Sequence, residues 1–312
     1  MTGVQTCALP IYAGELRLAK PKFFWSEMQN DPQDVVTNDR FLRADDIAVK
    51  TLPYDRGVVP LDAQWITVGI DVQMRGLYYL VQAISANFTS YVIEYGCYPE
   101  QKRPIWTAAT MRPTLAEVHK GMTEDAAIYL GLSALIKHLC EKRWMRVDGV
   151  AQALNLIGID ANWKTSIIKQ LVRESPFGPV VFPTHGNAIG CNECPISEYK
   201  SRTGERIGEE WIISKNSKSP VRFLRFDKNY WCTQSARRLS TVHPNPGAVS
   251  LYGPVGTRHD FLARHLDSEL RKTESGRRTV DVWTLRPGET ENHWWDCFVM
   301  GQMLGSVCGA RT

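Results

Sequence analysis

Trp65-Ile-Thr-Val-Gly-Ile-Asp71 and Leu154-Asn-Leu-Ile-Gly-Ile-Asp160 are two apolar stretches that end in the same phrase, Gly-Ile-Asp. Such apolar runs predict buried strands, and a carboxylate at the end of a buried strand is costly unless it has a partner. A third aspartate, Asp296, opens the apolar run 296–304 beside two tryptophans. Carboxylates that converge from separate elements are what a hard cation such as Mg²⁺ requires. The three aspartates therefore predict a metal site.

The pattern between residues 65 and 182 predicts an ordered series of elements. Three β-rich runs joined by short turns predict an antiparallel meander, and a long helix follows with Thr123 as its N-cap. A continuous apolar run then predicts a buried parallel strand, followed by a helix and a short strand. The predicted elements are strands 65–72, 77–85 and 90–97, helix 124–142, strand 154–159, helix 163–172 and strand 180–182.

This order is that of the RNase H-like fold, an α/β fold with a mixed sheet flanked by helices. In that fold the first and fourth strands lie side by side. Asp71 and Asp160 are 160 − 71 = 89 residues apart in the chain, and we expect them to meet at one end of the sheet. A last helix over residues 292–307 would bring Asp296 to them, with His293 as a supporting or capping residue rather than a ligand.

Three neighbouring carboxylates repel one another unless cations bind between them. Two Mg²⁺ or Mn²⁺ ions about 3.5–4 Å apart could activate water and stabilise the leaving oxygen of an in-line displacement. We therefore interpret Asp71, Asp160 and Asp296 as both metal ligands and catalytic residues of a phosphodiester-cleaving site. For each aspartate taken alone a turn or capping role is the favoured interpretation, so the prediction depends on the set and its order.

Charge is distributed unevenly along the 312 residues. The net charge is +4, and residues 151–312 hold 21 Lys and Arg against 16 Asp and Glu. Between Lys200 and Arg238 there are ten basic against four acidic residues, which favours a polyanionic partner such as double-stranded DNA. A solvated surface hairpin is the alternative. The candidate phosphate-binding residues are Lys200, Arg202, Arg222, Arg225 and Lys228, with a second basic group, Arg258, Arg264 and Arg271, on a helix predicted over 258–271.

Three short motifs carry a resemblance to a known family. The segments 66–73, 157–162 and 292–297 resemble the three nuclease motifs of phage terminase large subunits of the GpA-like class. The paired tryptophans Trp294 and Trp295, and Asn162-Trp163, depart from the family pattern but leave the carboxylates in place. The resemblance implies an RNase H-like endonuclease that cuts concatemeric viral DNA, with Asp71, Asp160 and Asp296 as metal ligands. It also implies a small terminase subunit and the portal or procapsid as partners, and a location in the host cytoplasm, transiently at the procapsid.

The domain organisation follows from the same comparison. Residues 1–12 are interpreted as an artefact of a sequencing adaptor, and residues 13–62 as the tail of an upstream ATPase region with a linker. Residues 63–312 would be the nuclease domain. No Gly-x-x-x-x-Gly-Lys-Ser/Thr loop occurs in the chain, so nucleotide hydrolysis is not assigned to it.

Zinc and membrane binding are both disfavoured. Cys191 and Cys194 have zinc-ligand spacing, with His185 as a third candidate, but there is no second Cys-x-x-Cys, and only Cys232 or His243 could complete the site. No stretch approaches the roughly 18–20 apolar residues of a membrane-spanning helix.

Two other functions remain open at this stage. One is a different RNase H-like nuclease or integrase, and the other is a non-catalytic module that binds DNA or a procapsid. Three clustered carboxylates argue against a surface that only binds DNA.

Overall fold

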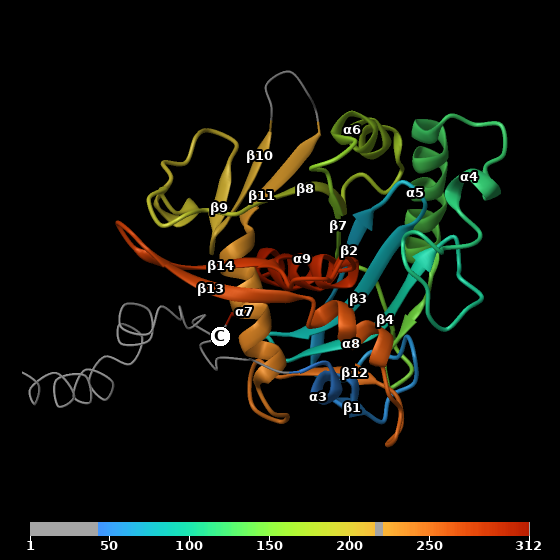
Figure 1. The fold of residues 1–312 in the computed structure, drawn as a ribbon, viewed down its shortest axis with the longest axis horizontal. Coiled ribbons are helices and arrows are strands. Elements are labelled where there is room, and N and C mark those ends of the chain that lie inside the picture. Colours follow the sequence, from blue (N-terminus) through green and yellow to red (C-terminus); the bar gives the residue numbers. More distant parts are fainter. Residues whose placement is uncertain (1–42, 216–220, 312) are drawn as a thin grey trace, which may run out of the picture. The chain divides into compact units, whose positions relative to one another are not determined.

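The computed structural model describes residues 43–215 and 221–311. The predicted artefact at residues 1–12, and most of the region predicted to be an ATPase tail, lie outside the described residues. Figure 1 traces the remaining chain as a sheet with helices packed around it. None of the helices in the described residues is long and apolar enough to cross a membrane.

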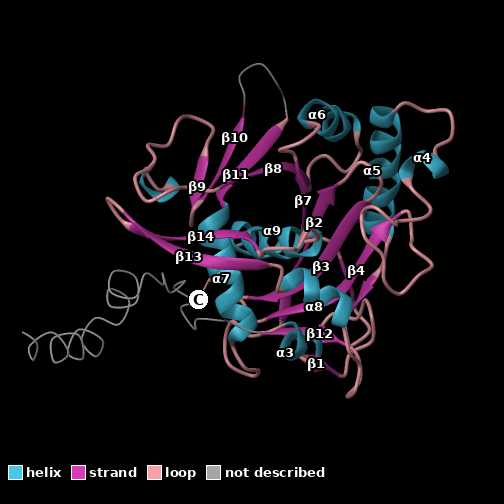
Figure 2. Ribbon diagram, in the orientation of Figure 1, coloured by secondary structure: helices cyan, strands magenta, loops and turns pink. Residues whose placement is uncertain are grey.

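Ten strands form the main sheet, in the order β1-β12-β4-β3-β2-β7-β8-β11-β10-β9. Two strand pairs lie outside it, β5 (Trp144–Met145) with β6 (Ala151–Gln152) and β13 (Glu269–Ser275) with β14 (Thr279–Leu285). Figure 2 shows the second pair as a ribbon separate from the main sheet. The strands of the main sheet are β1 (Thr51–Leu52), β2 (Ala63–Val72), β3 (Leu77–Ser85), β4 (Ser90–Tyr98), β7 (Leu156–Asp160), β8 (Val181–Asn187), β9 (Arg206–Gly208), β10 (Trp211–Lys215), β11 (Arg222–Asp227) and β12 (Val249–Tyr252).

The strand directions confirm the predicted fold class. β2, β3 and β4 form an antiparallel meander. β7 then lies parallel to β2, β8 parallel to β7, and β11 parallel to β8. A meander whose first strand pairs in parallel with the fourth is the RNase H-like arrangement. The helices are α3 (Ala44–Ala48), α4 (Leu115–Val118), α5 (Glu124–Glu141), α6 (Thr165–Glu174), α7 (Lys228–Ser240), α8 (Asp260–Leu266) and α9 (His293–Cys308), with a 3-10 turn, η2 (Ile196–Glu198).

The two faces of β2 meet different helices, because successive side chains of a strand point to opposite faces. Ile66, Val68 and Ile70 belong to the apolar core that also holds α5 and α6 side chains. On the other face the Thr67 hydroxyl donates to the Gly301 carbonyl of α9, at 3.0 Å. Asp71 has the same parity as Thr67, and it therefore points toward the face covered by α9.

Glycine lets α9 approach this face closely. Gly69 and Gly158 are register partners on β2 and β7. A Cβ atom built on Gly69 would overlap the Cys297 carbonyl of α9, and one built on Gly158 would lie 2.6 Å from the Met300 sulfur. The shared phrase Gly-Ile-Asp thus has a structural reason: the glycine admits the helix, and two residues later the aspartate reaches the start of that helix.

Two predictions about segments need correction. The helix predicted over 258–271 ends at Leu266, and β13 begins at Glu269, because that half of the segment pairs with β14 as a hairpin. Arg271 therefore lies on a strand, Arg258 precedes α8, and of the three predicted basic residues only Arg264 lies on that helix. Residues 228–240, within the predicted basic hairpin region, form α7. Residues 44–52, within the region predicted to be an upstream tail with a linker, form α3 and the edge strand β1 of the same compact unit.

Candidate metal centre

Asp71 and Asp160 lie on neighbouring parallel strands at the same edge of the sheet. Ile70 pairs with Ile159, so the two aspartates that follow them come next in register. The structure therefore brings together the two carboxylates that the sequence places 160 − 71 = 89 residues apart. β8 and β11 run in the same direction, so their carboxyl ends open onto this edge as well.

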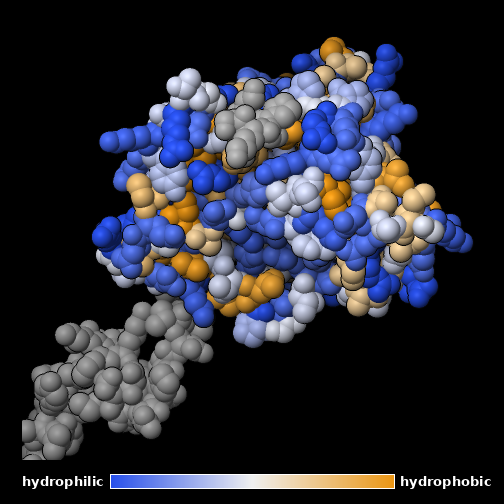
Figure 3. Space-filling model, turned by 90° about the horizontal axis from the view of Figure 1, so that it is seen from above, coloured by the Kyte–Doolittle hydropathy of each residue, from blue (hydrophilic) through white to orange (hydrophobic). Residues whose placement is uncertain are grey.

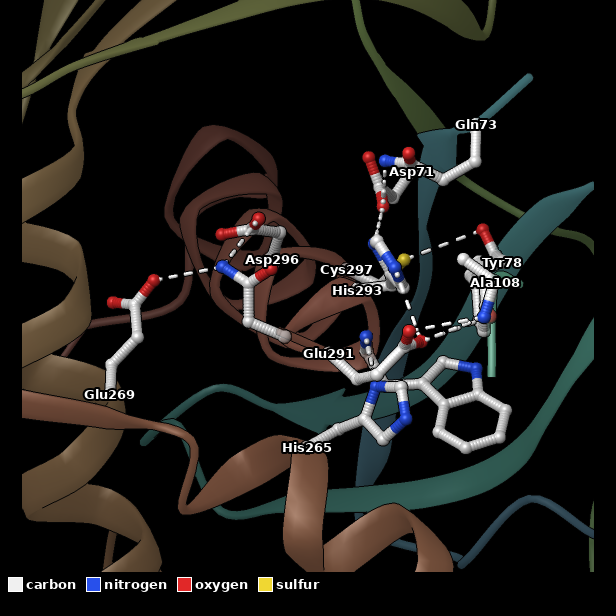
Figure 4. Close-up of polar contacts among 12 residues, drawn as sticks. Asp71, Gln73, Tyr78, Ala108, His265, Glu269, Glu291, His293, Asp296 and Cys297 are labelled. Atoms are coloured by element: carbon white, nitrogen blue, oxygen red, sulfur yellow. Dashed lines mark hydrogen bonds and ion pairs between the residues drawn. The ribbon is translucent and has the colours of Figure 1, made fainter. Parts of the chain in front are cut away.

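The Asp71 carboxylate is buried and held by one of its two oxygens. Oδ2 accepts from the Gln73 side-chain amide at 2.9 Å and lies 2.7 Å from His293 Nδ1. Figure 4 shows both contacts. Oδ1 accepts no hydrogen bond from the described residues. Asp71 is 4% exposed as a residue, and its second oxygen is an uncommitted acceptor of the kind that suits a hard cation.

The Asp160 carboxylate has a similar half-satisfied state. Oδ1 accepts from the Asn162 backbone amide at 3.0 Å, and Oδ2 accepts no hydrogen bond from the part of the chain that the structure describes. Burial raises the pKa of Asp160 to about 6; the Asn162 amide opposes this shift, and the negative charge of Asp71 adds to it. A cation between the two carboxylates would offset both penalties.

Asp296, in the first turn of α9, is paired with a lysine. Its Oδ1 lies 2.9 Å from Lys228 Nζ, and its Oδ2 accepts from the Asn292 side chain at 3.1 Å. Burial raises the pKa of Asp296 and the Lys228 charge opposes the rise, while Glu269 and Asp71 add to it. Burial also lowers the pKa of Lys228, but the charges of Asp296 and Glu269 outweigh burial and leave that pKa raised.

Lys228 was predicted to bind the DNA backbone from the surface, and the structure places it in this acidic site instead. It is the first residue of α7, directly after β11, whose carboxyl end opens onto the same edge as those of β2 and β7. Its ammonium also lies 3.3 Å from Glu269.

Glu269 is a fourth carboxylate that the sequence did not indicate. It is 6% exposed, and it accepts from Asn292 Nδ2 at 2.9 Å and from Trp295 Nε1 at 3.0 Å. The other half of the tryptophan pair, Trp294, donates to the Gly96 carbonyl at 3.0 Å. Of the two tryptophans that depart from the family pattern, Trp295 thus donates to a carboxylate of the site, whereas Trp294 donates to the β4 backbone.

The carboxylate oxygens of Asp71 and Asp160 fit a hard divalent cation. The third carboxylate, Asp296, forms an ion pair with Lys228 instead. No three His, Cys, Asp or Glu side chains of the described residues form a closed group that could hold a metal. Two of the carboxylates have other partners: His293 lies on one oxygen of Asp71, and Lys228 lies on one oxygen of Asp296. Asp71 and Asp160 each keep an uncommitted oxygen, whereas Asp296 can offer Oδ1 only when Lys228 moves.

The sequence matches the family model of the terminase large subunit gpA endonuclease domain over residues 36–312. The chain belongs to this family. It is therefore an endonuclease domain, and its match begins upstream of residue 63, where the sequence alone placed the start of the domain. No curated protein matches the chain.

One solved structure is similar to this terminase endonuclease domain. It is a mutant nuclease domain of the large terminase subunit gp2 of bacterial virus Sf6, with manganese and beta-thujaplicinol. The two share 10% sequence identity with a TM-score of 0.43, and the match covers 84% of this chain and 97% of that chain.

The other predicted DNA-binding residues of the endonuclease domain lie on its β8–β11–β10 extension. Lys200 and Arg202 are exposed in the loop after η2. Arg222 is exposed on β11, with its guanidinium 5.0 Å from the centre of the Phe182 ring, and half-buried Arg225 lies 6.0 Å from the centre of the Tyr199 ring. Figure 3 shows the molecule from above, where hydrophilic residues cover most of the surface.

The cysteine motif of the endonuclease domain lies beside this extension, where Cys194 lines a pocket together with Tyr199 and Arg225. Cys191 and Cys194 are free thiols, and Cys191 packs against Gly276 at the turn between β13 and β14. Cys232, a candidate to complete a zinc site, is buried in α7 with its sulfur 4.0 Å from Glu269.

Proposed function

We propose that this endonuclease domain cuts concatemeric double-stranded DNA by two-metal hydrolysis, with Asp71, Asp160 and Asp296 as the metal ligands. The observation that carries the proposal is the register of β2 and β7. It sets buried Asp71 and half-buried Asp160 side by side, and each carboxylate keeps one oxygen uncommitted. The helix that crosses the paired glycines brings the third aspartate from its first turn.

Mg²⁺ or Mn²⁺ would be held by Asp71 and Asp160 first. When bound, such ions polarise the phosphate and supply a hydroxide nucleophile at neutral pH. Gln73 donates to Asp71 Oδ2, and the Asn162 amide donates to Asp160 Oδ1. Asp71 Oδ1 and Asp160 Oδ2 therefore stay available to a metal. Asn292 likewise donates to Asp296 Oδ2, while Lys228 holds its Oδ1 until a stronger cation competes for it.

We further infer a place for this reaction in viral DNA packaging. The partners would be double-stranded DNA, a small terminase subunit and the portal or procapsid, in the host cytoplasm and transiently at the procapsid. Family membership supports DNA as the substrate. ATP hydrolysis is not included, because the chain contains no Gly-Lys dipeptide and hence no Walker A loop.

Plasmid cleavage with metal-ligand variants tests the proposal. The purified chain should nick or linearise plasmid DNA with Mn²⁺ or Mg²⁺ and stop when the metal is chelated. Asp71→Asn and Asp160→Asn should each reduce cleavage to the chelated background, because an amide lacks the charge that hard ions require. Asp148→Asn, in an exposed turn with an Arg146 ion pair, is the matched control and should cleave normally. Full cleavage by either site variant would reject the assignment.

A further inference from the structure

His293 connects the Asp71 carboxylate to a second acid, Glu291. Its Nδ1 lies 2.7 Å from Asp71 Oδ2, and its Nε2 lies 3.4 Å from Glu291 Oε2. Figure 4 shows the imidazole between the two carboxylates. The three side chains therefore form one chain of contacts that begins at the proposed metal centre and ends in the loop before α9.

Packing fixes the plane of the His293 ring. His293 is 7% exposed, and its ring stacks on that of Tyr78 with centroids 4.4 Å apart and planes tilted by 29°. The Tyr78 hydroxyl lies 3.4 Å from Glu291 Oε2, so the same tyrosine supports both partners. Because the ring is held in this plane, its Nδ1 faces Asp71 Oδ2.

Glu291 is in turn tied to a distant loop. Its carboxylate oxygens accept from the Ala108 backbone amide at 3.0 and 3.2 Å. Ala108 lies in a turn closed by the Thr110 amide, which donates to the Thr107 carbonyl at 3.0 Å. The 107–110 turn is thus connected to Asp71 by consecutive contacts through Glu291 and His293.

We propose that His293 and Glu291 are a positioning pair, which orients Asp71 for metal binding and joins the 107–110 turn to the metal centre. This inference rests on the proposed function. His293 and Gln73 both occupy Oδ2, so the carboxylate is held with Oδ1 toward the site. Partners of this kind behind a metal ligand are typically worth 10–100-fold in metal affinity, because they fix the orientation of the ligand before the metal binds.

Calorimetric titration of the full chain with Mn²⁺ alone tests the pair apart from catalysis. His293→Ala should weaken Mn²⁺ binding by about 10–100-fold. His293→Asn should recover most of the affinity, since its amide can replace Nδ1 as a donor to Asp71. Glu291→Ala should weaken binding, and Glu291→Gln should weaken it less, because the amide oxygen can still accept from Ala108. His259→Ala is the matched control: His259 is also a buried histidine, and its ring contacts Tyr95 and Tyr252, so Mn²⁺ affinity should stay unchanged.

The outcomes separate this inference from the proposed function. Unfolding midpoints in chelator identify variants that only lose stability. A purely structural role would lower those midpoints for His293→Ala while the folded protein bound Mn²⁺ as the wild type does, and that result overturns the positioning pair alone. Tighter Mn²⁺ binding by His293→Ala also overturns it, because the imidazole would then be a competitor of the metal. Absence of Mn²⁺ binding by the wild type overturns the proposed function and the pair together.

Discussion

The carboxylate edge and the basic extension of the sheet differ in how their charges are held. At the edge, Asp71, Glu269 and Lys228 are buried or partly buried, and each has a defined partner. On the extension, Arg222 and Arg225 lie over aromatic rings without a carboxylate within ion-pair distance among the described residues. Charges at the edge are positioned by backbone register and helix packing, whereas those on the extension retain the freedom of long side chains near solvent.

Lys228 shows why this difference matters. By sequence it belongs to the basic stretch, but its position after β11 carries it to the acidic edge, where it lies between Asp296 and Glu269. The density of basic residues therefore identifies a basic segment of the chain. The direction of the strands determines on which surface each basic residue of that segment lies.

The largest expected effect comes from the glycine that lets α9 approach the edge. In Gly69→Ala the new Cβ would meet the Cys297 backbone, which cannot move without shifting the helix. We expect a loss of about 3 kcal/mol in the free energy of unfolding, at the upper end of overpacking costs. For a domain of this size that corresponds to a fall of roughly 6–12 °C in Tm.

Gly158→Ala is the matched variant, because its Cβ would meet the flexible Met300 side chain rather than backbone. We expect about 1 kcal/mol or less there, since Met adapts to small changes in shape. Thermal unfolding of both variants decides the point, and equal losses would show that α9 is not held rigidly over the glycine pair.

A smaller effect should follow from removal of the lysine between the acids. In chelator at pH 7, Lys228→Met leaves Asp296 and Glu269 facing each other, and we expect a loss of about 2–3 kcal/mol. That is below the 3–5 kcal/mol cost for a fully buried pair, because the Lys228 side chain is 31% exposed. Added Mn²⁺ should restore much of the loss, since binding to the folded state stabilises it.

Denaturant titrations with and without Mn²⁺ measure this prediction. Lys200→Met on the exposed loop is the control and should stay within about 0.5 kcal/mol of the wild type. A Lys228→Met protein that is as stable as the wild type in chelator would contradict the prediction. It would show that the repulsion between Asp296 and Glu269 is offset by something other than Lys228.

The fold and the neighbouring positions of Asp71 and Asp160 could be predicted because the signals of their strands are local and strong. The strand predicted at 77–85 matches β3 at both ends, and the helix predicted at 124–142 matches α5 with Thr123 as its N-cap. Continuous apolar runs marked β2 and β7, and the order of elements then fixed their pairing. The neighbouring positions of Asp71 and Asp160 follow from that pairing.

The remainder depends on contacts that no local pattern encodes. α7 buries polar residues such as Asn229, Ser235 and Arg238, so its sequence lacks the apolar periodicity that identifies a helix. Glu269 lies at the open end of its hairpin, paired with Leu285, which is 285 − 269 = 16 residues away in the chain. Glu291 lies in a loop and acquires its role only through His293 and the Ala108 amide.

The smallest expected effect concerns the extension. If Arg222 and Arg225 contact phosphates, Arg222→Glu with Arg225→Glu should weaken DNA binding equally on any sequence, because phosphate contacts carry no base information. The slope of log affinity against log salt should become shallower by roughly 2, about one for each lost contact. The carboxylate edge should be unaffected, so Mn²⁺ affinity should stay at the wild-type value and excess DNA should restore much of the cleavage.

Binding to DNA over a range of salt concentrations, in chelator to prevent cleavage, measures the slope. Arg222→Glu alone provides the finer test, because Arg222 is exposed whereas Arg225 is half-buried over Tyr199; the single variant should account for about half of the change. Unchanged DNA binding at low salt in the double variant would show that Arg222 and Arg225 of β11 do not contact DNA and belong to an ordinary solvated surface. The DNA path would then have to be sought near Arg258 and Arg264. Arg271 is a weaker candidate, because it lies on β13 and forms an ion pair with Asp281.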